Sequence, residues 1–307
     1  MDGPNLILFK RLTTMINEKI LADVRQKIND IDDQLHDLLV QRTEIAEEVI
    51  LLKKNDTINL RPAREAQILY RLLNRHKGQF SRRELTRIWR EIIVATLQMQ
   101  GPFSIAVIET DDNAGYSDIA RDQYGSFTPM THHSSSRSVI EAVQKGKATV
   151  GILPWPEKEM LDPWWQFILF DAPDTPKIIG RLPFAGPSNS RNNHIEAAVI
   201  APITQEATGR DYSLLALEFK YEMSERQIKE LFLSIKLLVQ SCMFWRNGDH
   251  SGEYIYLIEV SSFVGLKSDL MQQILSTFNN QGNRVIHLGG YAAPLSIEEL
   301  ESFSEVN

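Results

Sequence analysis

Two cations lie on one face of a long predicted helix, where they could bind the same anion. Apolar residues recur every three to four positions from residue 21 to residue 52, but Arg42 stands where the next apolar residue is due between Leu38 and Ile45. Lys53 follows 11 residues later, which at about 100° per residue returns to within about 20° of that face. Arg25 precedes Arg42 by 17 residues and is turned about 100° away, so a second subunit could supply it to the same site.

Polar residues on two further predicted helices could complete such a site. Arg64 and Glu65 open the short second helix. On the third helix, a stripe at helical spacing begins with apolar residues and ends with a hydroxyl and an amide, at Trp89, Ile93, Thr96 and Gln100. These groups can donate hydrogen bonds to a small anion, and the carboxylate can accept one.

Cations that face the interior of a helical bundle are too costly to bury without counter-charge, and few carboxylates share their seam. A dianionic ligand would supply that charge. The alternative is that each residue fixes the register of a coiled coil or extends its charged end into water. The combined spacing favours the ligand.

Three helices must position these groups. The first, predicted for residues 21–54, would be about 51 Å long and therefore needs a partner along its length. Asn55-Asp56 ends it, and Pro62 starts a second helix that reaches about residue 76. The third is predicted for residues 81–100, with Ser81 as N-cap and Glu84 as its capping-box partner, before Gly101-Pro102. Residues 1–17 are expected to form a loosely ordered extension.

This segment resembles the helical chorismate mutase domain over residues 21–100. The resemblance implies a dimer of three-helix chains whose long helices cross, in which each active site takes one arginine from the neighbouring subunit. The residues that carry it are Arg25, Arg42, Lys53, the run Arg61-Pro-Ala-Arg64-Glu65-Ala66, Ile92-Ile93, Thr96 and Gln100.

The resemblance also implies a role for each polar residue. Arg25 of the partner and Arg42 would hold the two carboxylates of chorismate, and Lys53 and Gln100 would contact the ether oxygen whose bond breaks. In addition, Arg64 would add positive potential, Glu65 would meet the substrate hydroxyl, and Thr96 stands where the family often has serine. Arg61 is also a candidate substrate contact, although some relatives have an acidic residue there, which leaves a second hydroxyl contact open.

The remaining chain is predicted to be α/β. Strands are expected at 103–108, 148–153, 165–170, 177–184 and 197–203, with a helix at 138–146. A β-α-β-β-α-β order typical of a ferredoxin-like module follows, with strands at 212–219, 242–245, 254–260 and 284–288 and helices at 224–239 and 269–280. The two middle strands would form a hairpin across Asn247-Gly248-Asp249.

This part is similar to a reduced prephenate dehydratase joined to an ACT-like module. Residues 140–154 resemble the end of the first dehydratase lobe, but the Thr-Arg-Phe motif is missing and little room remains for a second lobe. We therefore expect no dehydratase activity. The phenylalanine-binding motifs of ACT domains are also missing, so a packing or dimerisation module is at least as well supported as an amino-acid sensor.

The expected architecture is therefore multidomain. An all-α chorismate mutase domain that forms an intertwined dimer is followed by an α/β region with a ferredoxin-like, ACT-like module. The expected bounds are 1–17 for the extension, 18–101 for the mutase domain, 102–208 for the dehydratase-like region, 209–296 for the module and 297–307 for a tail.

Composition limits the partners of the chain. A formal net charge of −7 argues against nucleic acid, and the single Cys242 cannot form an internal disulfide, which fits the cytoplasm. No apolar run approaches the roughly 20 residues of a membrane span. We expect no cofactor and no metal, because His132-His133 in a serine-rich loop lack a third ligand.

Two other functions stay open. One is a bifunctional chorismate mutase and prephenate dehydratase, and the other is a noncatalytic helical scaffold that regulates an enzyme of the aromatic pathway.

Overall fold

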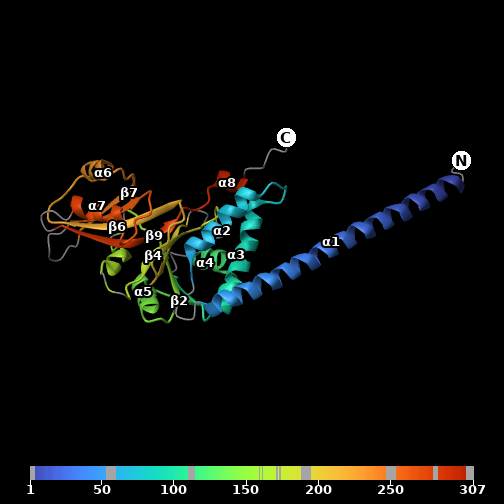
Figure 1. Cartoon of the computed structure of the whole chain (residues 1–307), viewed down its shortest axis with the longest axis horizontal. Helices are drawn as coiled ribbons and strands as arrows, with labels where there is room; N and C mark the ends of the chain where they lie inside the picture. Colours follow the sequence, from blue (N-terminus) through green and yellow to red (C-terminus); the bar gives the residue numbers. More distant parts are fainter. Residues whose placement is uncertain are drawn as a thin grey trace. The chain divides into compact units, whose positions relative to one another are not determined.

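The computed structural model describes residues 4–52, 60–109, 115–158, 160, 162–170, 172, 174–187, 195–246, 254–278 and 283–301, with side chains from residue 17 onward. The chain divides into two compact units, residues 1–57 and 58–307. Figure 1 gives the order of the elements along the chain. Within one chain, the second and third helices belong to the same compact unit as the α/β part. The predicted domain bounds therefore stay a prediction.

The described residues of the first unit form a single helix, α1, at Pro4–Leu52. Its 49 residues correspond to about 73 Å at 1.5 Å per residue. The expectation of a loosely ordered extension before residue 18 is wrong, because the helix already begins at Pro4. Residues 5–52 contain neither glycine nor proline, so nothing in this stretch interrupts the helix. The predicted helix end at Asn55-Asp56 lies outside the described residues.

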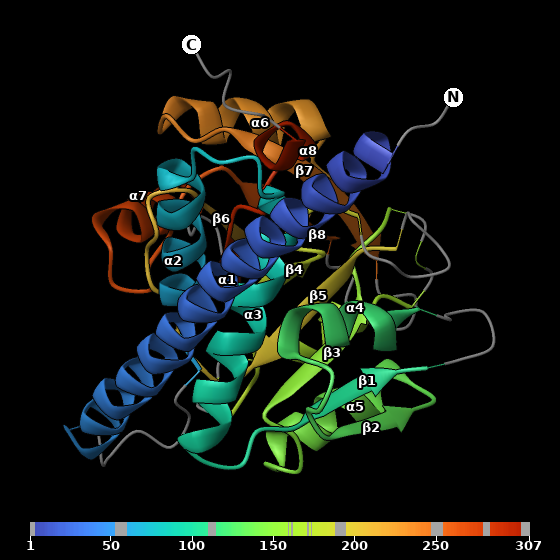
Figure 2. The ribbon, with the colours of Figure 1, turned by 90° about the vertical axis from the view of Figure 1, so that its right-hand side faces the viewer.

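The two predicted shorter helices are present as α2, at Pro62–Arg75, and α3, at Arg82–Met99. Pro62 takes the first helical turn, where the missing N–H costs nothing. Ser81 occupies the N-cap of α3 but its side chain makes no capping bond, so the predicted capping box is incomplete. Figure 2 shows α2 and α3 side by side on the α/β part, where the Tyr70 hydroxyl donates to the Ala293 carbonyl.

All the strands in the described part of the chain belong to one sheet of nine, in the order β2-β1-β3-β5-β4-β9-β6-β8-β7. The first five are β1 at Ile105–Ile108, β2 at Met130–His133, β3 at Val150–Pro154, β4 at Lys177–Leu182 and β5 at Ala197–Ala201. The last four are β6 at Asp211–Phe219, β7 at Val239–Arg246, β8 at Tyr254–Val260 and β9 at Arg284–Ala292.

The first half of the sheet has the predicted α/β character. Strand β1 pairs in parallel with β2 and β3, and the helices α4 at Tyr116–Tyr124 and α5 at Ser136–Gln144 connect them. The strand predicted for residues 165–170 is wrong, because Trp164–Ile168 forms a 3-10 helix. A short apolar run does not distinguish a strand from a buried helical turn, and here two tryptophans are buried in that turn.

The second half has the predicted ferredoxin-like topology. Strands β9, β6, β8 and β7 are neighbours in that order, and each pair is antiparallel. Helices α6 at Glu225–Ser234 and α7 at Asp269–Phe278 share their own core with these strands, centred on Phe232, Phe278 and Ile274. Helix α6 ends five residues before the predicted limit of 239, because residue 239 already begins β7. The predicted hairpin turn at 247–249 lies outside the described residues.

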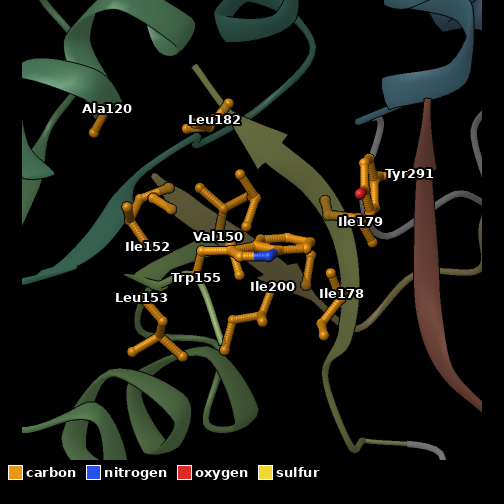
Figure 3. Close-up of a cluster of buried hydrophobic side chains, with 14 of the residues drawn as sticks. Ala120, Val150, Ile152, Leu153, Trp155, Ile178, Ile179, Leu182, Ile200 and Tyr291 are labelled. Carbon is orange, nitrogen blue, oxygen red and sulfur yellow. The ribbon is translucent and has the colours of Figure 1, made fainter. Parts of the chain in front are cut away.

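A shared core joins the two halves of the sheet where β4 meets β9. In Figure 3, Trp155 lies among Ile178, Ile200 and the side chains of β3, with Tyr291 of β9 nearby. The rings of Trp155 and Tyr291 meet edge to face, with centroids 5.3 Å apart. The same core includes Leu69 of α2 and Leu97 of α3, so these helices pack as part of the α/β body.

Three described elements carry no strong pattern in the sequence and were not predicted. They are α4, β2 and the short α8 at Ile297–Glu301, which lies in the expected tail. The pair His132-His133 is therefore at the end of a strand rather than in a loop. The imidazole of His132 pairs with the Glu109 carboxylate, and His133 contacts the Thr131 hydroxyl.

Candidate functional site

Helix α1 carries a continuous apolar face that its own unit leaves exposed. Exposed fractions range from 41% at Val49 to 61% at Ile45, and the same face includes Leu21, Val24, Ile28, Ile31, Leu35 and Leu38. A monomeric protein rarely exposes an apolar surface of this extent, which usually marks a protein interface.

The predicted cations of α1 differ in environment. Arg25 is exposed, whereas Arg42 is half-buried and burial lowers the pKa of its guanidinium. An arginine remains protonated despite such a shift, so a half-buried Arg42 retains its charge in a less polar environment. Lys53 lies outside the described residues.

The predicted polar end of the α3 stripe is present and half-buried. The Thr96 hydroxyl donates to the Ile92 carbonyl at 2.8 Å, and the Gln100 amide donates to the Thr96 carbonyl at 3.3 Å. Gln100 is the C-cap of α3. The helix end thus holds both side chains in one place.

Glu65 is placed differently from the prediction that it faces a substrate hydroxyl. Its carboxylate accepts a hydrogen bond of 2.9 Å from the Arg90 guanidinium of α3. Both residues are buried, at 8% and 5% exposure. Any contact of Glu65 with substrate would have to compete with this ion pair.

Burial controls the electrostatics of the Glu65 and Arg90 pair. Burial raises the pKa of Glu65 and lowers that of Arg90, while the attraction between the two groups opposes both shifts. The guanidinium also lies over the ring of Phe184, 4.7 Å from its centroid, and burial raises the pKa of the neighbouring Tyr124 hydroxyl. A cavity of about 20 Å³ adjoins the pair, which is enough for about one water molecule.

The arginines at the start of α2 are exposed. Arg61, the residue that precedes the helix, pairs with Glu206 at 3.5 Å, and both side chains are largely in solvent. Arg64 is also exposed. The structure thus brings together Thr96 with Gln100, and Glu65 with Arg90.

Arg90 is the residue that sequence reasoning missed. The predicted stripe of α3 was Trp89, Ile93, Thr96 and Gln100, of which Ile93 alone is fully buried. The buried stripe is Thr86, Arg90, Ile93, Val94 and Leu97. On a helix, Arg90 shares one face with Val94 and Leu97, because these residues lie four and seven positions after it. This spacing was the signal in the sequence for a buried arginine.

The described part of the chain contains no group of three or more His, Cys, Asp or Glu side chains arranged to hold a metal ion. None of its helices combines the length and apolar character that crossing a bilayer requires.

The comparison with known families confirms the resemblance of the helical segment. Residues 24–101 match the family model of chorismate mutase type II. The chain therefore has an N-terminal helical segment similar to chorismate mutase type II, followed by a mixed α/β region.

Two curated relatives and one solved structure show similarity over larger regions. The bifunctional chorismate mutase/prephenate dehydratase of Pseudomonas aeruginosa is 24% identical over 146 residues, which are 46% of this chain and 40% of the relative. That of Aquifex aeolicus is 27% identical over 139 residues, 44% of this chain and 38% of the relative. The chain thus matches less than half the length of these relatives. The structure of prephenate dehydratase from Streptococcus mutans aligns with 62% of this chain. The alignment includes 98% of that structure, with 13% sequence identity and a TM-score of 0.44.

Proposed function

We propose that this protein is a chorismate mutase, which rearranges chorismate to prephenate. The observation that supports this most strongly is the match of residues 24–101 to the family model of chorismate mutase type II. The rearrangement is pericyclic, so the site needs neither a nucleophile nor a metal. It needs orientation of the substrate and stabilisation of developing charge.

Two arginines orient the substrate in this proposal. Arg42 and the partner's Arg25 each bind one carboxylate through the planar guanidinium, which matches a carboxylate in two places. Holding both carboxylates selects the compact conformer in which the reacting carbons are close. This selection raises the rate because the reacting atoms are already near each other in the bound substrate. The half-buried position of Arg42 strengthens its attraction for an anion, because water screens it less.

Lys53 and Gln100 act on the bond that breaks. Negative charge grows on the ether oxygen as its bond to carbon lengthens, and a fixed ammonium with a fixed amide stabilises that charge more than it stabilises the ground state. The Gln100 amide, which donates to the Thr96 carbonyl in the described chain, would turn toward this oxygen. Arg64 adds positive potential, and the Thr96 hydroxyl lies next to Gln100.

Glu65 and Arg61 both have ion-pair partners in the described chain. Glu65 meets the substrate hydroxyl only if its pair with Arg90 opens or if its second oxygen accepts the additional bond. Arg61 is exposed and pairs with Glu206 at 3.5 Å, so its contact with substrate would require this surface pair to part.

A second copy of the chain covers the apolar face of α1 in this proposal. A helix of 49 residues cannot bury its apolar face within itself, and the first unit contains no other helix to cover that face among its described residues. Two crossing copies of α1 would bury each other's apolar residues and bring Arg25 of one copy to Arg42 of the other. The protein would then be a homodimer with shared active sites.

Chorismate consumption by the full-length chain tests the assignment. We expect chorismate to disappear and prephenate to appear in equal amounts, without added metal or cofactor. A noncatalytic regulatory scaffold would give only the uncatalysed rate, and this outcome would overturn the proposed activity.

The bifunctional alternative is favoured by the curated relatives, which are bifunctional chorismate mutase/prephenate dehydratases. Against it, the chain has no Thr-Arg-Phe motif where the dehydratase cleft would need one, and Asn193 to Glu196 stand in that region. We therefore propose that the α/β region at 102–208 lacks dehydratase activity. Incubation of the chain with prephenate should give no phenylpyruvate above the spontaneous background, and a clear enzymatic excess would establish the bifunctional enzyme instead.

The module at 209–296 is proposed to be ACT-like on the basis of its β-α-β-β-α-β order and sheet topology. Its separate core and its long edge strand β7 suit packing or dimerisation as well as effector binding. The single thiol and the acidic net charge of −7 support a cytoplasmic protein without a nucleic-acid partner.

A further inference from the structure

Two segments at the ends of the C-terminal module, residues 206–211 and 293–299, contact helix α2. The Gln67 amide of α2 donates to a backbone carbonyl of the first segment at 3.3 Å, and the Tyr70 hydroxyl donates to the Ala293 carbonyl of the second. The second segment includes the start of α8, which lies against α3 (Figure 1). The two segments therefore form a clamp on these helices, and the clamp and the helices belong to one compact unit.

Arg210 is the central residue of the clamp. Its guanidinium lies over the ring of Tyr70, 4.6 Å from the ring centroid. It also donates to both carboxylate oxygens of Glu299, at 2.7 and 3.0 Å. These hydrogen bonds raise the pKa of Arg210 and lower the pKa of Glu299, so both groups are charged at neutral pH. Two parallel bonds to one carboxylate fix the plane of the guanidinium, and the ring of Tyr70 is therefore held against an oriented cation.

Glu299 extends the clamp to the third helix. Its backbone carbonyl accepts a hydrogen bond of 3.0 Å from the Arg82 guanidinium at the start of α3. Its carboxylate also accepts from the Ser296 N–H at 2.9 Å, while its own N–H donates to the Ser296 hydroxyl at 3.2 Å. These reciprocal bonds cap α8 and fix the position of Glu299. One residue thus links Arg210, which holds α2, to Arg82 of α3.

A movement at this clamp would reach the proposed mutase site through α2. Tyr70 lies five residues after Glu65 and six after Arg64, which corresponds to about 8 and 9 Å along a helix axis. Helix α2 has only 14 residues and its apolar face is part of the common core, so it moves as one piece. Displacing a catalytic contact by about 1 Å can lower a rate by as much as about 100-fold. The clamp therefore sets the position of proposed substrate contacts that lie outside the module.

From these contacts we propose that Arg210 and Glu299 are positioning residues for the mutase reaction. They act without touching the substrate, through Tyr70, by holding the start of α2 in the place that catalysis requires. The inference rests on the proposed mutase function and adds to it a role for the C-terminal module, which is to support the helix that carries Arg64 and Glu65.

Steady-state kinetics of the full-length Arg210→Gln variant test this role. The substitution removes the cation over Tyr70 and the paired bonds to Glu299. We expect kcat for chorismate to fall by about tenfold to 100-fold per folded chain, with the folded fraction measured by circular dichroism. KM should change less, because the arginines proposed to bind the substrate carboxylates lie on α1.

Arg284→Gln is the matched control. It breaks an exposed pair with Glu218, at 3.2 Å, in the same module but away from α2, and it should keep the wild-type kcat. A wild-type chain without mutase activity would overturn the proposed function. That outcome differs from an active wild type whose kcat is unchanged in Arg210→Gln, which would overturn the positioning role alone.

Amide hydrogen exchange measures the clamp without an assay of activity. In Arg210→Gln, the amides of α2 at Pro62–Arg75 should exchange at least about threefold faster than in wild type, whereas those of α7 should be unchanged. Unchanged exchange in α2 would overturn the inference. If Arg210→Gln fails to fold, Glu299→Gln decides the matter, because it keeps the shape of the side chain and removes its charge. We expect it to lower kcat by about threefold or more, and wild-type kcat in that variant would contradict the assigned role.

Discussion

Replacing Lys53 with alanine should lower kcat/KM for chorismate by about 10³-fold, at the upper end of the effect of losing one preorganised donor to a developing oxyanion. This loss corresponds to about 4 kcal/mol of transition-state stabilisation. The effect should appear in kcat with little change in KM, because Lys53 acts on charge that exists only as the ether bond breaks. Steady-state kinetics of chorismate consumption measure both constants.

Lys54→Ala is the matched control for this substitution. It removes the same charge one residue later, which on a helix is turned by about 100° to another face. We expect it to retain nearly the wild-type rate. If Lys53→Ala and Lys54→Ala had the same activity, the assignment of Lys53 to the ether oxygen would be wrong, and so would the geometry that places it on the face of Arg42.

Replacing Arg90 with methionine should lower the free energy of unfolding by about 3–5 kcal/mol, because it leaves the Glu65 carboxylate buried without its partner. The Arg90 guanidinium nitrogen and the Glu65 carboxylate oxygen are 2.9 Å apart, and the side chains are 6% exposed for Arg90 and 10% exposed for Glu65. The arginine also loses its contact with the ring of Phe184. Urea unfolding at a fixed chain concentration measures the change.

Two further variants separate the ion pair from general damage. The double variant Glu65→Leu with Arg90→Met removes both charges and should be more stable than Arg90→Met alone, because no buried charge remains. Arg226→Ala breaks an exposed pair with Glu230 and should change the free energy of unfolding by less than about 1 kcal/mol. A double variant no more stable than Arg90→Met alone would contradict this account, because the cost of Arg90→Met would then not come from leaving the Glu65 carboxylate buried without a partner.

The helices of the mutase segment could be predicted closely because their ends carry strong local signals. Pro62 and Ser81 mark the starts of α2 and α3, and Gly101-Pro102 follows the end of α3. The ferredoxin-like order was likewise predictable, since its strands are long and its helices amphipathic. The early start of α1 was missed because its first residues lack a polar and apolar periodicity, although nothing in them breaks a helix.

What failed depends on contacts between distant residues. The 3-10 turn at Trp164–Ile168 is apolar except for Gln166, and its conformation is set by packing of its tryptophans in the core rather than by its own pattern. Likewise, local spacing gives no indication that Glu65 would pair with Arg90, which lies 25 residues later on another helix. The joint of β4 with β9 brings together residues more than 100 apart in the chain, and periodicity carries no information about such pairings.

The most direct test of the shared active site is complementation between inactive chains. Arg25→Ala and Arg42→Ala should each be inactive alone, and mixing them with exchange of subunits should restore about a quarter of the wild-type activity, because half the dimers are mixed and each mixed dimer has one complete site. Mixing Arg42→Ala with Lys53→Ala should restore nothing, since both residues come from the same subunit at each site. Activity in the first mixture alone would support a dimer that borrows Arg25 from the neighbour, whereas no recovery in the first mixture after verified exchange would contradict it.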